Sequence, residues 1–204
     1  MSSNEYINAH DAFIFELDDV IYPEKDYLLQ VYYLFAQFME YTEQTDGSQM
    51  IRFMQETYAR EGETGLFAKT AVHFNLPEKY QSNYVLLHQN ARLPLKLLLF
   101  APVLAFMQEV ILAGKRLFLL TDGDPDMQLN KIKQLEWNGI EKYMAVYFTE
   151  EIAKGSTEQA IEVIVNFNSV NPEKVIFIGK HGQDAAKAFS KGINFLPIDK
   201  LLLL

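Results

Sequence analysis

Three carboxylates follow a short apolar segment near the start of the chain, and their spacing could support chemistry. The segment from Phe13 to Phe15 is too short for a helix and too aromatic for a loop, which predicts a buried strand of a parallel sheet. Glu16, Asp18 and Asp19 come directly after it. Residues two apart in an extended chain share a face, so Glu16 and Asp18 repel each other unless a cation or a proton intervenes. The alternative is a strand that ends in a solvated acidic turn.

Polar, loop-forming residues also follow two later apolar segments. They run from Thr121 to Asp124 and from Gly179 to Asp184. Because the carboxyl ends of parallel strands meet at one edge of a sheet, we expect these residues to lie near Glu16. A further segment, Thr149 to Lys154, adds a lysine. This set suits a phosphoryl group held by amides, a hydroxyl and an ammonium, with carboxylates placed for chemistry or for a metal ion.

The pattern of secondary structure that must position these residues changes once along the chain. Residues 24 to about 94 carry helical periodicity and no strand signal, whereas strands and helices alternate after them. The alternation predicts an α/β fold with a doubly wound, Rossmann-like parallel sheet. We expect a core of residues 1–22 and 95–204, with a four-helix insertion at residues 23–94. The later strands are expected at residues 116–120, 144–148, 175–178 and 195–198, and the core helices at 103–113, 125 to about 138, 158–168 and 185–190.

Composition narrows the classes of partner. The 204 residues fit one domain, or one core with an insertion, and 27 acidic against 18 basic residues give a net charge of −9. That balance argues against nucleic acid or an anionic membrane as a partner, although it allows a phosphate ligand held by a few local cations. The absence of cysteine excludes disulfides, thiolate metal sites and a cysteine nucleophile. With no signal-peptide or membrane-spanning pattern, we expect a cytoplasmic protein, and its oligomeric state stays open.

Taken together, the motifs resemble the haloacid dehalogenase-like (HAD) hydrolase superfamily over nearly the whole chain. Phe15 to Tyr22 is similar to the first motif of that family, Asp-x-Asp-x-Thr/Val. Leu119 to Gly123 is similar to the second motif, an apolar segment that ends in Thr or Ser, and Lys154 is the candidate for the lysine of the third. Residues 175–184 are similar to the fourth motif, Gly-Asp-x-x-x-Asp. The inserted helices match the family's cap between the first two motifs.

The resemblance implies phosphoryl transfer from a small phosphorylated molecule. The residue at the position of Glu16 attacks phosphorus and forms an acyl-phosphate, while Asp18 protonates the leaving group and then activates water. Thr121 and Lys154 complete the implied catalytic set. An ordinary structural role stays open for each residue, and for Lys154 the alternative is a solvated loop lysine.

The resemblance also implies sites for the phosphoryl group and for a metal ion. Thr121, Lys154 and the two residues after Thr121, Asp122 and Gly123, would bind the phosphoryl oxygens. Glu16, the backbone carbonyl of Asp18, and Asp184 would bind Mg²⁺. Asp184 also stands at the start of a predicted helix, where a carboxylate is favourable simply as a cap.

The chain departs from the family pattern at two positions of this site. Glu16 stands where the nucleophilic Asp is expected, and its extra methylene shifts the oxygens by about 1 Å, a displacement that can cost about 100-fold in rate. Lys180 stands where the fourth motif has its first Asp, and an ammonium has no lone pair for a metal ion. We therefore expect impaired phosphatase activity, doubtful Mg²⁺ binding, and the ammonium of Lys180 in the place of the metal. The alternatives are a non-catalytic phosphate-binding, small-molecule-binding or regulatory protein of the same fold, and metal-independent dehalogenation, which Glu16 also disfavours.

Overall fold

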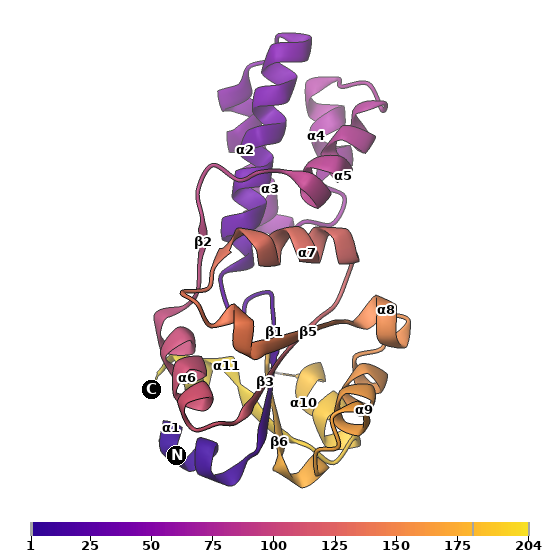
Figure 1. Ribbon diagram of the computed structural model, residues 1–204. Coiled ribbons are helices and arrows are strands. Elements are labelled where there is room, and N and C mark those ends of the chain that lie inside the picture. Colours follow the sequence, from indigo (N-terminus) through magenta and orange to yellow (C-terminus); the bar gives the residue numbers. More distant parts are fainter. Residues whose placement is uncertain (1, 181, 204) are drawn as a thin grey trace. The chain divides into compact units, whose positions relative to one another are not determined.

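The computed structural model describes residues 2–180 and 182–203, and the chain divides into two compact units (Figure 1). Unit 1 comprises residues 1–24, 97–128 and 135–204, and unit 2 comprises residues 25–96 and 129–134. The sequence pattern instead predicts that residues 129–134 belong to the core. His181, which belongs to the stretch similar to the fourth motif, lies outside the described residues.

Unit 1 is built on a five-stranded parallel sheet with the order β5-β3-β1-β6-β7. The strands are β1 Ala12–Glu16, β3 Arg116–Thr121, β5 Met144–Phe148, β6 Val175–Gly179 and β7 Asn194–Pro197. The predicted α/β fold with a parallel sheet is confirmed. The first strand is central and fully buried from Ala12 to Phe15, which explains why it is apolar on both faces.

Helices cover both faces of this sheet (Figure 1). Phe13 and Phe15 of β1 pack against Phe106 of α6, whereas Ile14 belongs to a core cluster with Ile161 of α9. The helices of unit 1 are α1 Ser3–Ala9, α6 Ala101–Leu112, α8 Thr149–Ala153, α9 Thr157–Phe167, α10 Gln183–Ser190 and α11 Ile198–Leu202. Successive side chains of β1 point to opposite faces of the sheet. This alternation fixes the direction of the Glu16 side chain at the end of the strand.

The register of the strands brings the candidate residues to one edge. Phe15 is opposite Leu119 of β3 and Ile178 of β6, and Glu16 is opposite Leu120. Thr121, the last residue of β3, therefore lies one residue beyond Glu16 on the neighbouring strand. Strands lie about 4.8 Å apart, so this edge is a compact region.

The helix that begins at Pro125 is shorter than the sequence predicts. Asp124 caps its start as expected, since its side chain accepts a hydrogen bond from the N–H of Met127 at 2.9 Å. The helix, α7 Pro125–Gln134, does not reach residue 138, because Leu135 adopts an extended conformation with ψ of 141°. β4 Leu135–Glu136 instead pairs with β2 Leu97–Leu98. The helix ends here because the chain pairs with a segment far away in the sequence. The periodicity of apolar residues along a helix cannot predict such pairing.

Unit 2 is helical, as the periodicity of residues 24–94 predicts. Its helices are α2 Glu24–Glu43, α3 Gly47–Glu61, α4 Leu66–Phe74 and α5 Tyr80–Asn90, with the second half of α7. Aromatic side chains fill its interior, and Tyr27, Tyr32 and Phe35 of α2 are fully buried. Lys131 of α7 is also fully buried, with its Nζ atom 5.3 Å from the centre of the Tyr27 ring. Within the described part of the chain, no helix combines the length and the apolar character needed to cross a membrane.

Candidate active site

Glu16 lies at the carboxyl end of the central strand and is largely buried. Only 22% of its side chain is exposed, and its Oε1 atom lies 4.0 Å from Nζ of Lys180. Its Oε2 atom has no hydrogen-bond partner among the described residues. Burial raises the pKa of Glu16 to about 7, and the charge of Asp184 adds to this effect while Lys180 opposes it. Burial therefore favours the protonated form of Glu16 far more than is usual for an exposed carboxyl at neutral pH.

Asp18 is held in the turn that follows the strand. The Tyr22 hydroxyl donates a hydrogen bond to its Oδ1 atom at 2.8 Å, and Nε2 of Gln128 donates to its Oδ2 atom at 2.9 Å. Asp19 adopts a left-handed conformation with φ of 59°, and its side chain accepts the N–H of Glu24 at 2.9 Å. These contacts fix the orientation of the Asp18 carboxyl group. Sequence reasoning missed Gln128, because it lies on a different element 110 residues away.

The end of β3 carries the Thr121 hydroxyl, which has no partner in the described structure, and the loop after it carries the Asp122 carboxylate, which accepts two hydrogen bonds. Thr121 is 1% exposed, and its Oγ1 atom has no hydrogen-bond partner within the described structure. Asp122 accepts a hydrogen bond from the Thr149 hydroxyl at 2.6 Å and from the N–H of Gly123 at 2.9 Å. Gly123 has φ of 100°, a conformation that favours glycine. A buried hydroxyl without a partner is costly, and Thr121 therefore has a hydrogen-bonding group available at this edge of the sheet.

Asp184 lies beside Glu16 together with two lysines. Its Oδ2 atom accepts the backbone N–H of Lys180 at 2.9 Å, and its Oδ1 atom lies 3.4 Å from Nζ of Lys187. The side chain of Lys180 is 45% exposed. The ammonium that approaches Asp184 most closely therefore belongs to Lys187 rather than to Lys180. Gly179 keeps this arrangement compact, since a Cβ atom there would lie 3.1 Å from Oδ2 of Asp184.

The two candidate lysines of this site differ in their surroundings. Lys154 caps α8 in a left-handed conformation with φ of 49°, and its side chain is exposed. Its assignment as a phosphate ligand stays a prediction. Lys187 is partly buried, with Nζ also 3.5 Å from the hydroxyl of Thr157, and its charge lowers the pKa of Glu16 against the effect of burial. One feature of the sequence points to Lys187. Asp184 stands three residues before it, and residues at i and i+3 of a helix share a face, so the two side chains can form a pair.

The residues present do not fit the Mg²⁺ that the family typically uses. Among the described residues, no group of three or more His, Asp or Glu side chains is arranged to hold a metal ion. One oxygen of Asp184 is already occupied by a backbone N–H, and the other faces the ammonium of Lys187. Lys180 adds a second positive charge 4.0 Å from Glu16. The ammonium groups of Lys180 and Lys187 compensate the charge of Asp184 and of ionised Glu16, and both would repel a divalent cation.

Comparison with known proteins supports the resemblance seen in the sequence. The description of the matching family is haloacid dehalogenase-like hydrolase, and the match covers residues 13–198. The search of curated proteins found no match.

Solved structures share the fold at low sequence identity. A candidate β-phosphoglucomutase from Thermotoga maritima is 18% identical, with a TM-score of 0.62 and coverage of 95% of this chain and 97% of that chain. L-2-haloacid dehalogenase from Xanthobacter autotrophicus, with chloropropionic acid covalently bound, is 15% identical, with a TM-score of 0.53 and coverage of 91% and 76%. A hydrolase from Streptococcus pneumoniae is 14% identical, with a TM-score of 0.52 and coverage of 92% of both chains. At these identities the likeness concerns the fold alone. With a parallel sheet, motifs in the family order and a family match over most of its length, the chain belongs to the haloacid dehalogenase-like hydrolases.

Proposed function

We propose that the chain binds a small phosphorylated molecule at the carboxyl edge of its sheet and hydrolyses phosphomonoesters only weakly. The Thr121 hydroxyl, buried without a described partner, carries this proposal. A phosphoryl oxygen would accept its hydrogen bond, and the ammonium groups of Lys180 and Lys187 would compensate the negative charge.

Three features of the same edge support weak turnover. A protonated carboxyl is a poor nucleophile, and the pKa of Glu16 is raised to about 7 by burial. The side chain is also one methylene longer than the Asp of the family motif. The lysine pair, finally, carries two positive charges but offers neither a coordination site for oxygen ligands nor the octahedral geometry of Mg²⁺.

A second candidate is a working phosphatase that uses Glu16 as its nucleophile. The unpartnered Oε2 atom of Glu16 favours it, because that oxygen is available for attack. In this reaction Oε2 forms a bond to phosphorus, the bond from phosphorus to the leaving oxygen breaks, and Asp18 gives that oxygen a proton. Water then attacks phosphorus, the bond to Oε2 breaks, and the proton of the water returns to Asp18.

Calorimetric titration with inorganic phosphate tests the binding site. We expect Thr121→Val to weaken phosphate binding at least about 10-fold, since it removes the hydroxyl and keeps the shape of the side chain. Lys187→Met should weaken it similarly. Thr64→Val, at an exposed threonine of unit 2, is the matched control and should leave the affinity unchanged. Equal phosphate affinity in Thr121→Val and in the unaltered protein would contradict the proposal.

A panel of phosphomonoesters, assayed with and without Mg²⁺, separates the two candidates. We expect turnover well below about 1 s⁻¹ under both conditions. Turnover at that rate or faster would establish the second candidate, and its loss on adding a chelator would also overturn the conclusion about the metal. In a reversal series, Lys180→Asp should create Mg²⁺ binding measurable by calorimetry, and adding Glu16→Asp should raise activity above either single change. Tight Mg²⁺ binding by the unaltered protein would contradict the role given to the lysines.

The composition supports the rest of the proposal. The net charge of −9 disfavours nucleic acid and anionic membranes as partners, so we propose small-molecule partners and a cytoplasmic location.

A further inference from the structure

A glutamine of α7 links two loops at the carboxyl edge of the sheet in unit 1. Gln128 is 3% exposed, and its Nε2 atom donates hydrogen bonds to Oδ2 of Asp18 at 2.9 Å and to the backbone carbonyl of Asp122. Asp18 belongs to the loop after β1, whereas Asp122 directly follows Thr121, the last residue of β3. The two loops are therefore joined through one buried carboxamide.

These two contacts determine which way the carboxamide points. A carboxamide nitrogen carries two hydrogens, and here both have an acceptor. If the group were turned over, its oxygen would face the carboxylate oxygen of Asp18 and the carbonyl oxygen of Asp122, and these acceptors would repel it. In the observed orientation Oε1 of Gln128 has no hydrogen-bond partner among the described residues, which is costly for a buried atom. The carboxamide therefore contributes through its two donated hydrogen bonds.

Both acceptors of Gln128 are also held by a second donor. The Tyr22 hydroxyl donates to Oδ1 of Asp18 at 2.8 Å. The Thr149 hydroxyl, at the start of α8 directly after β5, donates to the carboxylate of Asp122 at 2.6 Å. Hydrogen bonds thus connect the loops after three neighbouring strands, β1, β3 and β5, through Gln128. Such a network restrains its members more than separate pairs would.

We propose that Gln128 is a positioning residue that keeps the Asp18 carboxyl group at a fixed distance from the Thr121 hydroxyl. This role rests on the proposed function, in which Thr121 holds a phosphoryl oxygen and Asp18 gives its proton to the leaving oxygen as the bond from phosphorus to that oxygen breaks. Gln128 neither gains nor loses a proton. Because a displacement of about 1 Å can cost about 100-fold in rate, the link acts on proton transfer rather than on phosphate binding.

Two phosphomonoesters that differ in their leaving group test this role. Phenolate is basic and gains from protonation as it leaves, whereas dinitrophenolate departs as a stable anion. We follow kcat/KM, which reports the steps up to release of the leaving group. Gln128→Leu should lower kcat/KM for phenyl phosphate at least about 10-fold and change it for dinitrophenyl phosphate less than about 2-fold. A merely structural defect would lower both values together.

A second variant keeps the shape of the side chain. Gln128→Glu replaces the donor by a carboxylate, which repels the carboxylate of Asp18. It should lower kcat/KM for phenyl phosphate at least as much as Gln128→Leu does. The amide NMR spectrum of each variant verifies its fold.

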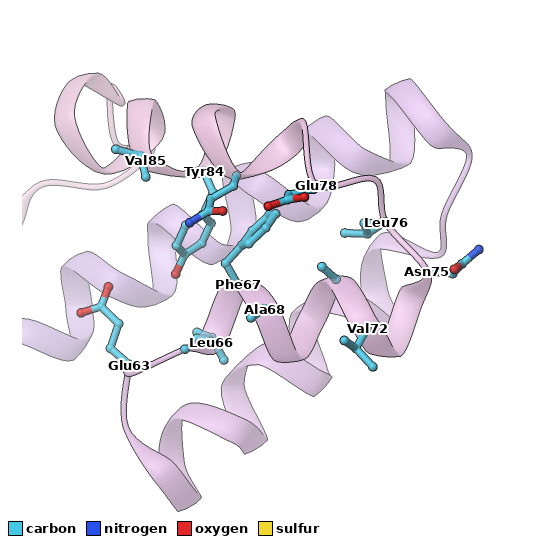
Figure 2. Close-up of a pocket in the computed structure, with 13 residues that line it drawn as sticks. Glu63, Leu66, Phe67, Ala68, Val72, Asn75, Leu76, Glu78, Tyr84 and Val85 are labelled. Carbon is cyan, nitrogen blue, oxygen red and sulfur yellow. The ribbon is translucent and has the colours of Figure 1, made fainter.

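Two exposed glutamines provide matched controls for the change to leucine. Gln159 lies on α9 of unit 1, and Gln81 lines a mostly apolar groove of about 620 Å³ between α4 and α5 of unit 2 (Figure 2). None of the residues that line this groove belongs to the proposed phosphate site. Gln159→Leu and Gln81→Leu should leave kcat/KM for both esters unchanged.

Calorimetric titration with inorganic phosphate separates this role from the proposed function. Gln128→Leu should keep the phosphate affinity within about 2-fold, because Gln128 has no hydrogen bond to the Thr121 hydroxyl in the described structure. Equal losses with the two esters, or no loss, would overturn the role of Gln128 and leave phosphate binding intact. No detectable turnover of either ester by the unaltered protein would also overturn it. An unaltered protein that binds no phosphate would overturn the proposed function and, with it, this role.

Discussion

Carboxylates in the two units lie beside basic side chains that differ in their charge. At the sheet edge of unit 1, Glu16 and Asp184 lie beside the ammonium groups of Lys180 and Lys187. In unit 2, Oε1 of Glu63 lies 3.7 Å from Nε2 of His88, and burial lowers the pKa of His88 to about 4, so this imidazole is neutral at pH 7. The ammonium groups of unit 1 therefore compensate carboxylate charge directly, whereas the neutral imidazole of His88 does not. The comparison shows that burial decides whether a basic side chain beside a carboxylate carries the charge needed to compensate it.

Burial also acts on the two units with opposite sign. It raises the pKa of Glu16 to about 7 and lowers the pKa of His88 to about 4, because it disfavours the charged form of each group. One group therefore favours the folded state at low pH and the other at high pH. The unaltered protein combines both effects over nearly the same pH range.

The largest expected effect concerns Asp184, which contacts Lys180 and Lys187 at the sheet edge. Asp184→Ala should lower the free energy of unfolding by about 3–4 kcal/mol, because it leaves the N–H of Lys180 and the ammonium of Lys187 without their acceptor. Asp126→Ala, which also removes an acid from the first turn of a helix but at an exposed position, should cost less than about 1 kcal/mol. Urea unfolding followed by the fluorescence of Trp137, the single tryptophan, reports on unit 1. Equal losses in the two variants would remove the distinction between a cluster and a surface acid.

The next effect is the dependence of unit 1 on pH. Below about pH 4.5 Glu16 holds a proton in both states, and between 4.5 and about 7 only the folded state keeps it. The folded state therefore loses up to about 3 kcal/mol as the pH rises through this range. Glu16→Gln should abolish the loss and make unit 1 more stable than the unaltered protein at pH 8.

Trp137 fluorescence in urea at pH 4.5 and 8 measures this difference. The control is Glu109→Gln, at an exposed position of α6, which should keep the original pH dependence. A Glu16→Gln variant with the same pH dependence as the unaltered protein would show that burial does not shift this carboxyl.

A comparable effect of opposite direction is expected in unit 2. Between about pH 4 and 6.5 only the unfolded state takes up a proton at His88, so the folded state loses up to about 3 kcal/mol as the pH falls. His88→Phe should abolish this loss, and His73→Phe, at an exposed histidine, should not. NMR signals of unit 2 followed in urea at pH 4.5 and 7 measure the change. Titration of His88 near pH 6.5 in the folded protein would contradict the prediction.

The smallest effect compares two buried threonines at the sheet edge. Thr149→Val should cost about 1–2 kcal/mol, because the hydroxyl donates to Asp122 at 2.6 Å. Thr121→Val should cost nothing without ligand and should raise stability if anything, since it removes a buried hydroxyl that has no partner in the described structure. Equal costs at the two positions, measured by Trp137 fluorescence, would show that Thr121 has a structural partner and would weaken its assignment to phosphate.

Much of the fold follows from local pattern. Phe13 to Phe15 is apolar on both faces and becomes the central strand, and the helical periodicity of residues 24–94 becomes α2 to α5. Asp124 caps α7 as its position before Pro125 predicts. These features depend on side-chain types at short spacing, which the sequence displays directly.

The candidate site is determined only in part by the sequence. Sequence alone brings Glu16, Thr121 and Asp184 to one edge, because the ends of parallel strands converge there. It does not predict that Gln128 binds Asp18, that Thr149 binds Asp122, or that Lys187 is the closest ammonium to Asp184. The sequence also does not predict that α7 ends at Gln134 or that β4 pairs with β2. Each depends on residues far apart in the chain, and only tertiary packing decides which polar groups lose water together and must therefore become partners.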